Sequence, residues 1–168
     1  MGDGGLLASS SDGRFLFATA TDSAAAFAID EASGALSRLG TVPTAIPCPA
    51  SVALADGLLL LPCYLGGGGV AVVERRADGT LGEEVQTIGP FGAGSNADAA
   101  RQEEAHPHSG WLSPLGARTV FLVPDLGSDK VRSFVVDVSA KRLVPAGELD
   151  LAPGSGPRHL DFHPTLPM

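Results

Sequence analysis

Short apolar runs alternate with polar turn signals along the whole chain. In the first quarter, apolar runs occupy residues 15–20, 24–29 and 35–42, and turn residues lie at Gly13 and Gly34. Runs of this length, bounded by glycine-containing turns, predict β-strands. No long stretch places apolar residues at the spacing of an amphipathic helix, so the pattern predicts an all-β protein.

The same order of runs and turns recurs twice more. The second unit has runs at residues 51–54, 58–64, 70–75 and 80–88, and the third at residues 110–113, 119–124, 131–137 and 143–151. Gly13 and Gly57 are 44 residues apart, and Gly34 and Gly79 are 45 apart. A period of about 45–50 residues with four short strands per unit indicates β-propeller blades. A β-sandwich has similar strand spacing, but the recurring turn–strand–loop–strand order favours the propeller.

The repeats therefore predict one incomplete propeller domain over residues 1–168. Its three four-stranded blades are expected at about residues 3–46, 47–104 and 105–156, with the first strand of a fourth blade within about residues 157–168.

A 50-residue offset also relates the third unit to the start of the fourth, because Ser113-Pro114 recurs as His163-Pro164. That offset superposes His108 on Arg158. Equivalent positions in neighbouring blades face the same channel mouth, so we expect His108 and Arg158 to lie close together.

Composition and charge limit the classes of partner and substrate that the chain can bind. Hydrophobic residues make up 44% of the chain, which indicates a folded core. The formal net charge is −8, which argues against nucleic-acid and anionic-membrane partners and requires a local positive site for any anionic substrate. The sequence has no apolar run of about 20 residues and no signal-peptide pattern at its start, so the expected compartment is the cytoplasm. Cys48 and Cys63 are expected to be buried thiols rather than a disulfide or a metal-binding pair.

The residues with acid–base chemistry concentrate in one stretch. All four histidines and the only tryptophan lie between Arg101 and Pro164. A histidine can take a proton from water that attacks a carbonyl group, and an arginine beside it can hold an anion or stabilise an oxyanion. A metal site is the weaker alternative, because the spacings of His106, His108, His159 and His163 fit no zinc pattern well. We therefore expect no metal and no cofactor.

Other polar positions have a structural interpretation. His163, which precedes a proline, is expected to satisfy backbone groups of a turn. Asp125 and Asp129 are expected to cap their own loop, since aspartates accept hydrogen bonds from local backbone amides. The four glycines at residues 66–69 are expected to form a hairpin loop, because no helix pattern follows them.

Three motifs carry a resemblance to a known family. They are AHPHS at residues 105–109, VPDLGSDK at 123–130 and GSGPRHLDFHP at 154–164. Together they resemble the seven-bladed propeller lactonases, a family that includes bacterial 6-phosphogluconolactonases and fungal carboxy-cis,cis-muconate cyclases. The resemblance is strongest over residues 102–164, while the earlier repeats match by rhythm alone.

The resemblance implies metal-independent lactone hydrolysis or lactone formation at the channel mouth, by a histidine, arginines and a glutamate. The catalytic residues map to His108 and Arg158. The substrate-binding residues map to His106, Arg101, Gln102 and His159, with His106 also competing for the role of the catalytic histidine. The implied partner is a small anionic lactone or carboxylate.

The chain departs from the family pattern at its end. It stops where the second strand of the fourth blade should begin, so the Asn-Glu pair of that strand and a further arginine lie beyond it. We therefore expect a fragment of a 6-phosphogluconolactonase-like hydrolase with impaired activity. The alternatives are a muconate cyclase-like isomerase and a non-catalytic fragment or binding module. Unpaired strand edges in an open ring also predict self-association.

Overall fold

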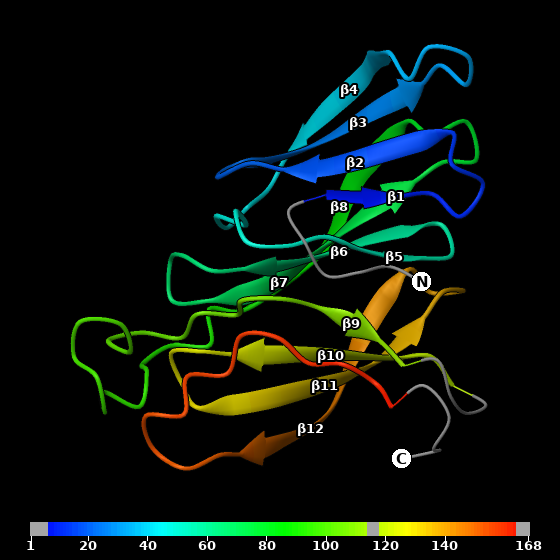
Figure 1. Ribbon diagram of the computed structural model, residues 1–168. Helices are drawn as coiled ribbons and strands as arrows, with labels where there is room; N and C mark the ends of the chain where they lie inside the picture. Colours follow the sequence, from blue (N-terminus) through cyan, green and yellow to red (C-terminus); the bar gives the residue numbers. More distant parts are fainter. Residues whose placement is uncertain (1–6, 114–117, 164–168) are drawn as a thin grey trace.

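The computed structural model describes residues 7–113 and 118–163, and within them twelve strands form three four-stranded antiparallel sheets (Figure 1). In each sheet the strands follow chain order. The first sheet contains β1 (Leu7–Ser9), β2 (Phe15–Thr19), β3 (Ser23–Ile29) and β4 (Leu36–Pro43). The second contains β5 (Ala53–Ala55), β6 (Leu58–Cys63), β7 (Gly69–Arg75) and β8 (Leu81–Ile88). The third contains β9 (Trp111–Leu112), β10 (Val120–Asp125), β11 (Lys130–Asp137) and β12 (Arg142–Asp150).

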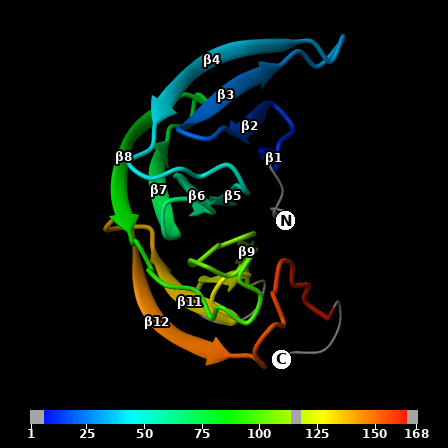
Figure 2. The same cartoon turned by 90° about the vertical axis from the view of Figure 1, so that its left-hand side faces the viewer.

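The three sheets form an open arc. Figure 2 shows β4, β8 and β12 along the convex side and β1, β5 and β9 on the concave side. Each unit therefore runs from an inner strand to an outer strand, as a propeller blade does. The prediction of an all-β partial propeller is confirmed, and three fanned sheets exclude the two-sheet sandwich. No helix in the described part of the chain is long and apolar enough to cross a membrane.

The middle sheet is buried on both faces, which explains its continuous apolar run. Leu59 and Leu61 belong to the core shared with the first sheet, whereas Leu58 and Leu60 belong to the core shared with the third. Successive strand residues point to opposite faces, so an unbroken run of leucines supplies both interfaces. Burying one such side chain stabilises the fold by about 1.5–3 kcal/mol. These leucines therefore hold the three sheets together.

The turn glycines lie where the sequence predicts turns. Gly13, Gly34, Gly57 and Gly79 all have φ between +68° and +81°, a region that glycine adopts without steric cost. Gly79 has a second role, since a Cβ atom there would collide with the ring of Phe15 in the first sheet. The β7–β8 turn is thus also part of the contact between the first and second sheets.

The two cysteines differ from expectation. Cys48 and Cys63 are joined by a disulfide, and both side chains are fully buried. The prediction of two thiols is therefore wrong. Cys48 lies in the link between the first two sheets and Cys63 ends β6, so the bridge ties that link to the second sheet. Two cysteines 15 residues apart carry no sequence signal for pairing, because proximity depends on the path of the connecting chain.

The segment predicted to form the first strand of a fourth blade also differs from the expectation. Residues 157–163, the described part of that segment, form no strand and follow an irregular path after β12. A strand requires ladder hydrogen bonds to a neighbour, and the described residues contain no strand that pairs with this segment. The remaining expected residues, 164–168, lie outside the described part.

Candidate functional site

The segment before β9 runs along the end of β10. Pro107 forms an isolated antiparallel bridge with Asp125, and the amide of His108 donates to the Pro124 carbonyl at 2.9 Å. The amide of Leu126 in turn donates to the carbonyl of His106, at 3.0 Å. Backbone pairing thus sets the position of both histidines at the start of the innermost strand, as the repeat predicts.

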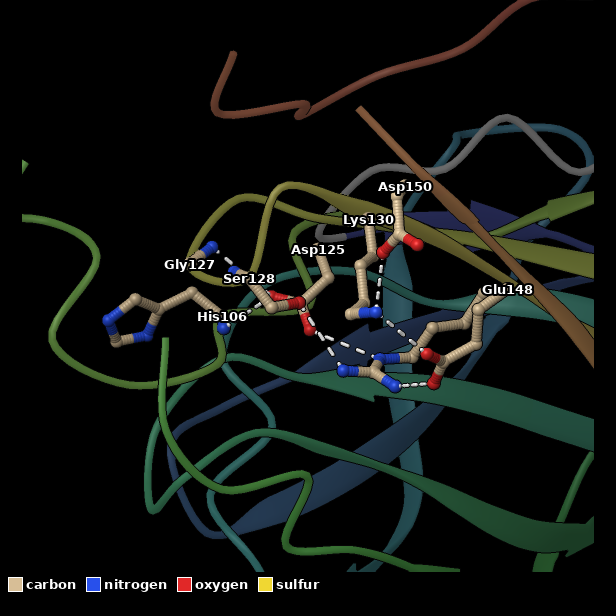
Figure 3. A network of polar contacts seen from close by, with 8 residues as sticks. His106, Asp125, Gly127, Ser128, Lys130, Glu148 and Asp150 are labelled. Atoms are coloured by element: carbon tan, nitrogen blue, oxygen red, sulfur yellow. Dashed lines mark hydrogen bonds and ion pairs between the residues drawn. The ribbon is translucent and has the colours of Figure 1, made fainter. Parts of the chain in front are cut away.

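A buried carboxylate reinforces this pairing. Oδ1 of Asp125 accepts hydrogen bonds from the amides of His106 at 2.7 Å, Gly127 at 3.1 Å and Ser128 at 3.2 Å (Figure 3). Oδ2 accepts from Nε of Arg132 at 3.2 Å. In Figure 3 the imidazole of His106 points away from these groups. The expected role of Asp125 as a loop cap is confirmed, and the link to the His106 backbone is an addition to it.

Arg132, the cation that pairs with Asp125, belongs to a larger group of ion pairs between β11 and β12. Arg132, which is almost fully buried, also pairs with Glu148, and its guanidinium lies 4.1 Å from the ring centroid of Phe91. Lys130 pairs with Asp150 at 2.6 Å and with Glu148 at 3.0 Å. These ion pairs join β11 to β12. Arg132 therefore serves the structure of the third sheet.

His106 lies in a closely packed environment. Its ring stacks on Tyr64 with a centroid distance of 4.3 Å, and its Nδ1 lies 2.7 Å from the Tyr64 carbonyl oxygen. Its Nε2 lies 3.4 Å from Oε1 of Glu103. Both ring nitrogens therefore have protein partners, and only 3% of the residue is exposed. This environment suits a positioning role better than proton transfer with solvent.

His108 has a different environment, because it is only half-buried. Its Nδ1 is buried and has no hydrogen-bond partner among the described residues. Its ring meets the ring of His159 edge-on at 5.1 Å and that of Tyr64 at 5.8 Å. Burial is the largest influence on the pKa of His108 and lowers it below the usual range; the positive charges of His159, Arg158 and Arg101 lower it further. The neutral imidazole therefore predominates at neutral pH and can accept a proton.

The segment around His108 and the segment around Arg158 meet through direct contacts. Oγ of Ser109 donates to the carbonyl of Arg158 at 2.6 Å, and Nε1 of Trp111 donates to Oγ of Ser109 at 3.1 Å. With the contact between His108 and His159, these bonds bring the two segments together as the 50-residue offset predicts. The catalytic roles of His108 and Arg158 stay predictions.

A cavity of about 540 Å³ lies beside these segments. Its lining includes Arg101 and Arg158, both exposed. The remaining lining residues are Asp98, Gln102, Leu126, Gly154, Ser155, Gly156 and Pro157. Two guanidinium groups on one cavity can hold a carboxylate or phosphate by charge-assisted hydrogen bonds. A cavity of about 570 Å³ between the first two sheets is larger, but its lining contains no histidine.

Gln102 contributes to the cavity wall from a buried position. Its Nε2 donates to the Leu126 carbonyl and to Oδ1 of Asp129, both at 2.8 Å. Its Oε1 accepts from the Asp98 amide at 3.0 Å. The carboxamide is thus bonded to protein groups, and the predicted contact between Gln102 and substrate stays a prediction.

For two residues of the site, the sequence analysis missed the contacts that the structure shows. Tyr64 was not singled out, although the only tyrosine of the chain, directly after the end of β6, is a signal that could have found it. Asp129 was expected to cap its own loop, but its carboxylate accepts from Ser95, Gly154 and Gly156, which are far away in sequence. Periodicity carries no information about such contacts between loops.

Known proteins resemble this chain over most of its length. The 6-phosphogluconolactonase of Bacillus subtilis is 32% identical over 141 residues, which cover 83% of this chain and 38% of that protein. The 6-phosphogluconolactonase of Yersinia pestis is 46% identical over 62 residues, or 35% of this chain and 17% of that protein. The solved structure of the periplasmic gluconolactonase PpgL of Pseudomonas aeruginosa superposes with a TM-score of 0.82 and 33% identity, covering 94% of this chain and 47% of that one.

This chain therefore spans less than half the length of these relatives. The family profile described as "Lactonase, 7-bladed beta-propeller" matches residues 2–168. The three fanned sheets and the motifs around both histidine segments agree with that match. The chain belongs to the seven-bladed β-propeller lactonase family.

Proposed function

We propose that this chain carries part of the active site of a lactone hydrolase that opens a sugar-acid lactone such as 6-phosphogluconolactone. Membership of the lactonase family and the relatives named 6-phosphogluconolactonase support the reaction class. The observation that carries the proposal is the half-buried His108, with one unpartnered ring nitrogen among the described residues, beside segments that bear two arginines.

The proposed chemistry is general-base hydrolysis. The neutral imidazole of His108 takes a proton from water, and the water oxygen attacks the lactone carbonyl carbon. The carbonyl electrons move to oxygen, where Arg158 stabilises the negative charge. When the tetrahedral intermediate collapses, the bond between the former carbonyl carbon and the ring oxygen breaks. The imidazolium of His108 then gives its proton to the leaving alkoxide. General-base help contributes about 10²–10⁴ in rate and one oxyanion donor about 10²–10³.

The remaining predicted residues take supporting roles in this proposal. Arg101 binds the anionic group of the substrate from the cavity wall, and His159 contacts substrate from its exposed position beside His108. His106 and Gln102 are almost fully buried, so we assign them to shaping the site rather than to direct contact.

Acid release in a pH-stat tests the proposal, with 6-phosphogluconolactone and unphosphorylated gluconolactone as substrates. His108→Asn should lower kcat by about 10² or more, and Arg158→Gln should lower kcat by about 10²–10³ for both lactones. Arg101→Gln should raise KM most for the phosphorylated lactone. Arg38→Gln, an exposed arginine of the first sheet, is the matched control and should change neither constant. A His108→Asn protein that retains the parent kcat contradicts the proposal.

The alternatives give different signals in the same preparation. A cyclase-like isomerase consumes a conjugated diene, so its reaction lowers ultraviolet absorbance without opening the lactone. A non-catalytic fragment binds 6-phosphogluconate in calorimetry but turns over neither substrate. Because this chain matches 38% of the Bacillus subtilis relative, we expect turnover well below that of the relative. A rate within about tenfold of that relative would refute this expectation.

Compartment and self-association are finer points of the same proposal. Disulfides persist in oxidising compartments, so the bridge between Cys48 and Cys63 favours such a compartment over the cytoplasm predicted from the sequence. Thiol trapping in intact cells, followed by mass spectrometry, distinguishes an oxidising compartment from the cytoplasm.

We also propose self-association through strand edges, where Leu7 is 55% and Leu149 60% exposed. A single monomeric sedimentation peak would contradict that.

A further inference from the structure

Asp129 occupies an unusual position on the β10–β11 connection. Its φ is +54°, in the left-handed region that a residue with a side chain adopts at a cost, and only 3% of it is exposed. Oδ1 accepts from Nε2 of Gln102 at 2.8 Å and from the Gly156 amide at 2.7 Å. Oδ2 accepts from Oγ of Ser95 and from the Gly154 amide, both at 2.7 Å. Each oxygen thus has two donors.

The four donors come from two segments that are separate in sequence. Ser95 and Gln102 belong to the connection after β8, and the two glycines belong to the segment after β12. Arg101 directly precedes one donor, and Arg158 follows another by two residues. Further backbone bonds reinforce the arrangement: the Leu151 amide donates to the Asp129 carbonyl at 2.8 Å, and the Asn96 amide to the Gln102 carbonyl at 2.9 Å. One carboxylate therefore joins the segments that carry both cavity arginines.

We propose that Asp129 is a positioning residue, whose buried carboxylate holds the backbones of Arg101 and Arg158 so that both guanidinium groups face the candidate site. The inference rests on the proposed function, since it assigns the arginines to an anionic substrate. Asp129 does not itself line the cavity and acts through the segments that do. Hydrogen bonds to an ionised acceptor are stronger than neutral ones, so a carboxylate suits four convergent donors better than an amide does.

Opposing electrostatic effects make the idea testable without substrate. Removing the negative charge of Asp129 would by itself lower the pKa of His108, because an anion favours the protonated imidazole. Burial is the largest cause of the lowered pKa of His108, and the charges of His159, Arg158 and Arg101 lower it further. Releasing the two arginines therefore has the opposite effect and raises that pKa. A rise in the pKa of His108 on Asp129→Asn therefore reports displaced cations or a loosened segment, and not the lost charge.

The experiment is a histidine titration by NMR. The four imidazole Cε1–H signals are followed with pH, and His108→Asn assigns the signal of His108. In Asp129→Asn, the pKa of His108 should rise toward its ordinary value of about 6.5. In the Arg158→Gln background the same substitution should produce a smaller rise. Asp137→Asn is the matched control, because Asp137 caps a turn at the opposite end of β11, and it should leave the titration unchanged.

Each outcome decides the matter. An unchanged or lowered pKa overturns the proposal, and so does a rise of undiminished size in the Arg158→Gln background. If Asp129→Asn fails to fold, Ser95→Ala takes its place: it removes one donor and should raise the pKa by a smaller amount, and no change overturns the proposal.

Kinetics then separate this inference from the proposed function. If the parent chain opens lactone, Asp129→Asn should raise KM through Arg101 and lower kcat through Arg158, but it should lower kcat less than His108→Asn does, since His108 is retained. If the parent opens no lactone, the proposed function fails while the titration still tests the role of Asp129. If lactone is opened but titration and KM stay unchanged in Asp129→Asn, the inference alone fails.

Discussion

Replacing Asp125 by alanine should destabilise the third sheet strongly. The carboxylate is fully buried, and its loss removes the acceptor for the amides of His106, Gly127 and Ser128. It also removes one of the two carboxylates that pair with Arg132. The substitution therefore leaves buried donors and a buried charge with less compensation.

The magnitude follows from what remains after the substitution. Breaking a buried ion pair by removing one partner costs about 3–5 kcal/mol, and one unsatisfied buried donor about 1–3 kcal/mol. Arg132 keeps Glu148, whose side chain is 44% exposed, and also keeps Phe91, so its charge is not isolated. These partners bring the ion-pair loss below that range, and the three amides that lose their acceptor add to it. We therefore expect the free energy of unfolding to fall by about 3–5 kcal/mol in total.

Lys130→Ala is the matched control in the same network. Lys130 pairs with the same Glu148 and with Asp150, but its side chain is 29% exposed and that of Asp150 80% exposed. Solvent-exposed pairs contribute about 0–1 kcal/mol. Urea denaturation followed by the fluorescence of Trp111, the only tryptophan, measures both variants. Equal and small losses for Asp125→Ala and Lys130→Ala would refute the reasoning from burial.

Three further outcomes are expected from the structure. Gly79→Ala should lower the free energy of unfolding, measured by thermal denaturation, by about 2–4 kcal/mol, because it adds a steric collision to a positive φ. Gly13→Ala, which has open space at its Cβ, should lower it by only about 1–2 kcal/mol. The lowered pKa of His108 means that unfolding takes up a proton below about pH 6.5, so stability should fall as pH decreases below that value, and His108→Asn should remove this part of the slope in urea titrations at several pH values. Reduction of the bridge between Cys48 and Cys63, which closes a loop of 15 residues, should cost about 3 kcal/mol, as measured by urea unfolding with and without reductant.

The fold could be predicted from the sequence because its determinants are local and periodic. Gly34 and Gly79 recur at the blade period and both adopt positive φ in the turns that the pattern indicates. The run from Leu58 to Leu61 lies in a predicted strand, and the structure shows this strand in the middle sheet, buried on both faces. Neither inference needs to know which distant residues touch. Residues 157–163, the described part of the segment predicted to hold a strand within 157–168, form no strand, because a strand depends on a partner beyond the segment itself.

The site was predictable only as far as the repeat reaches. An offset between repeats relates His108 to Arg158, and the structure joins their segments through Ser109. The contacts of Asp129 join loops that no repeat relates, and the disulfide depends on the path of a linker. Such contacts depend on the three-dimensional course of irregular backbone, for which a single sequence has no periodic signal.

Two buried carboxylates, Asp125 at the end of β10 and Asp129 just before β11, hold different segments of the site. Asp125 ends β10 and holds the histidine segment that precedes β9, while Asp129 holds the two segments that carry the arginines. The proposed proton acceptor and the proposed anion-binding groups therefore have separate supports, four residues apart in the sequence. Loss of Asp125 should disturb the position of His108 together with stability, and loss of Asp129 should disturb the arginines while His108 keeps its place. Because the two carboxylates act on different segments, substitutions around the arginines should be able to change which anion the site binds without moving His108, the proposed general base.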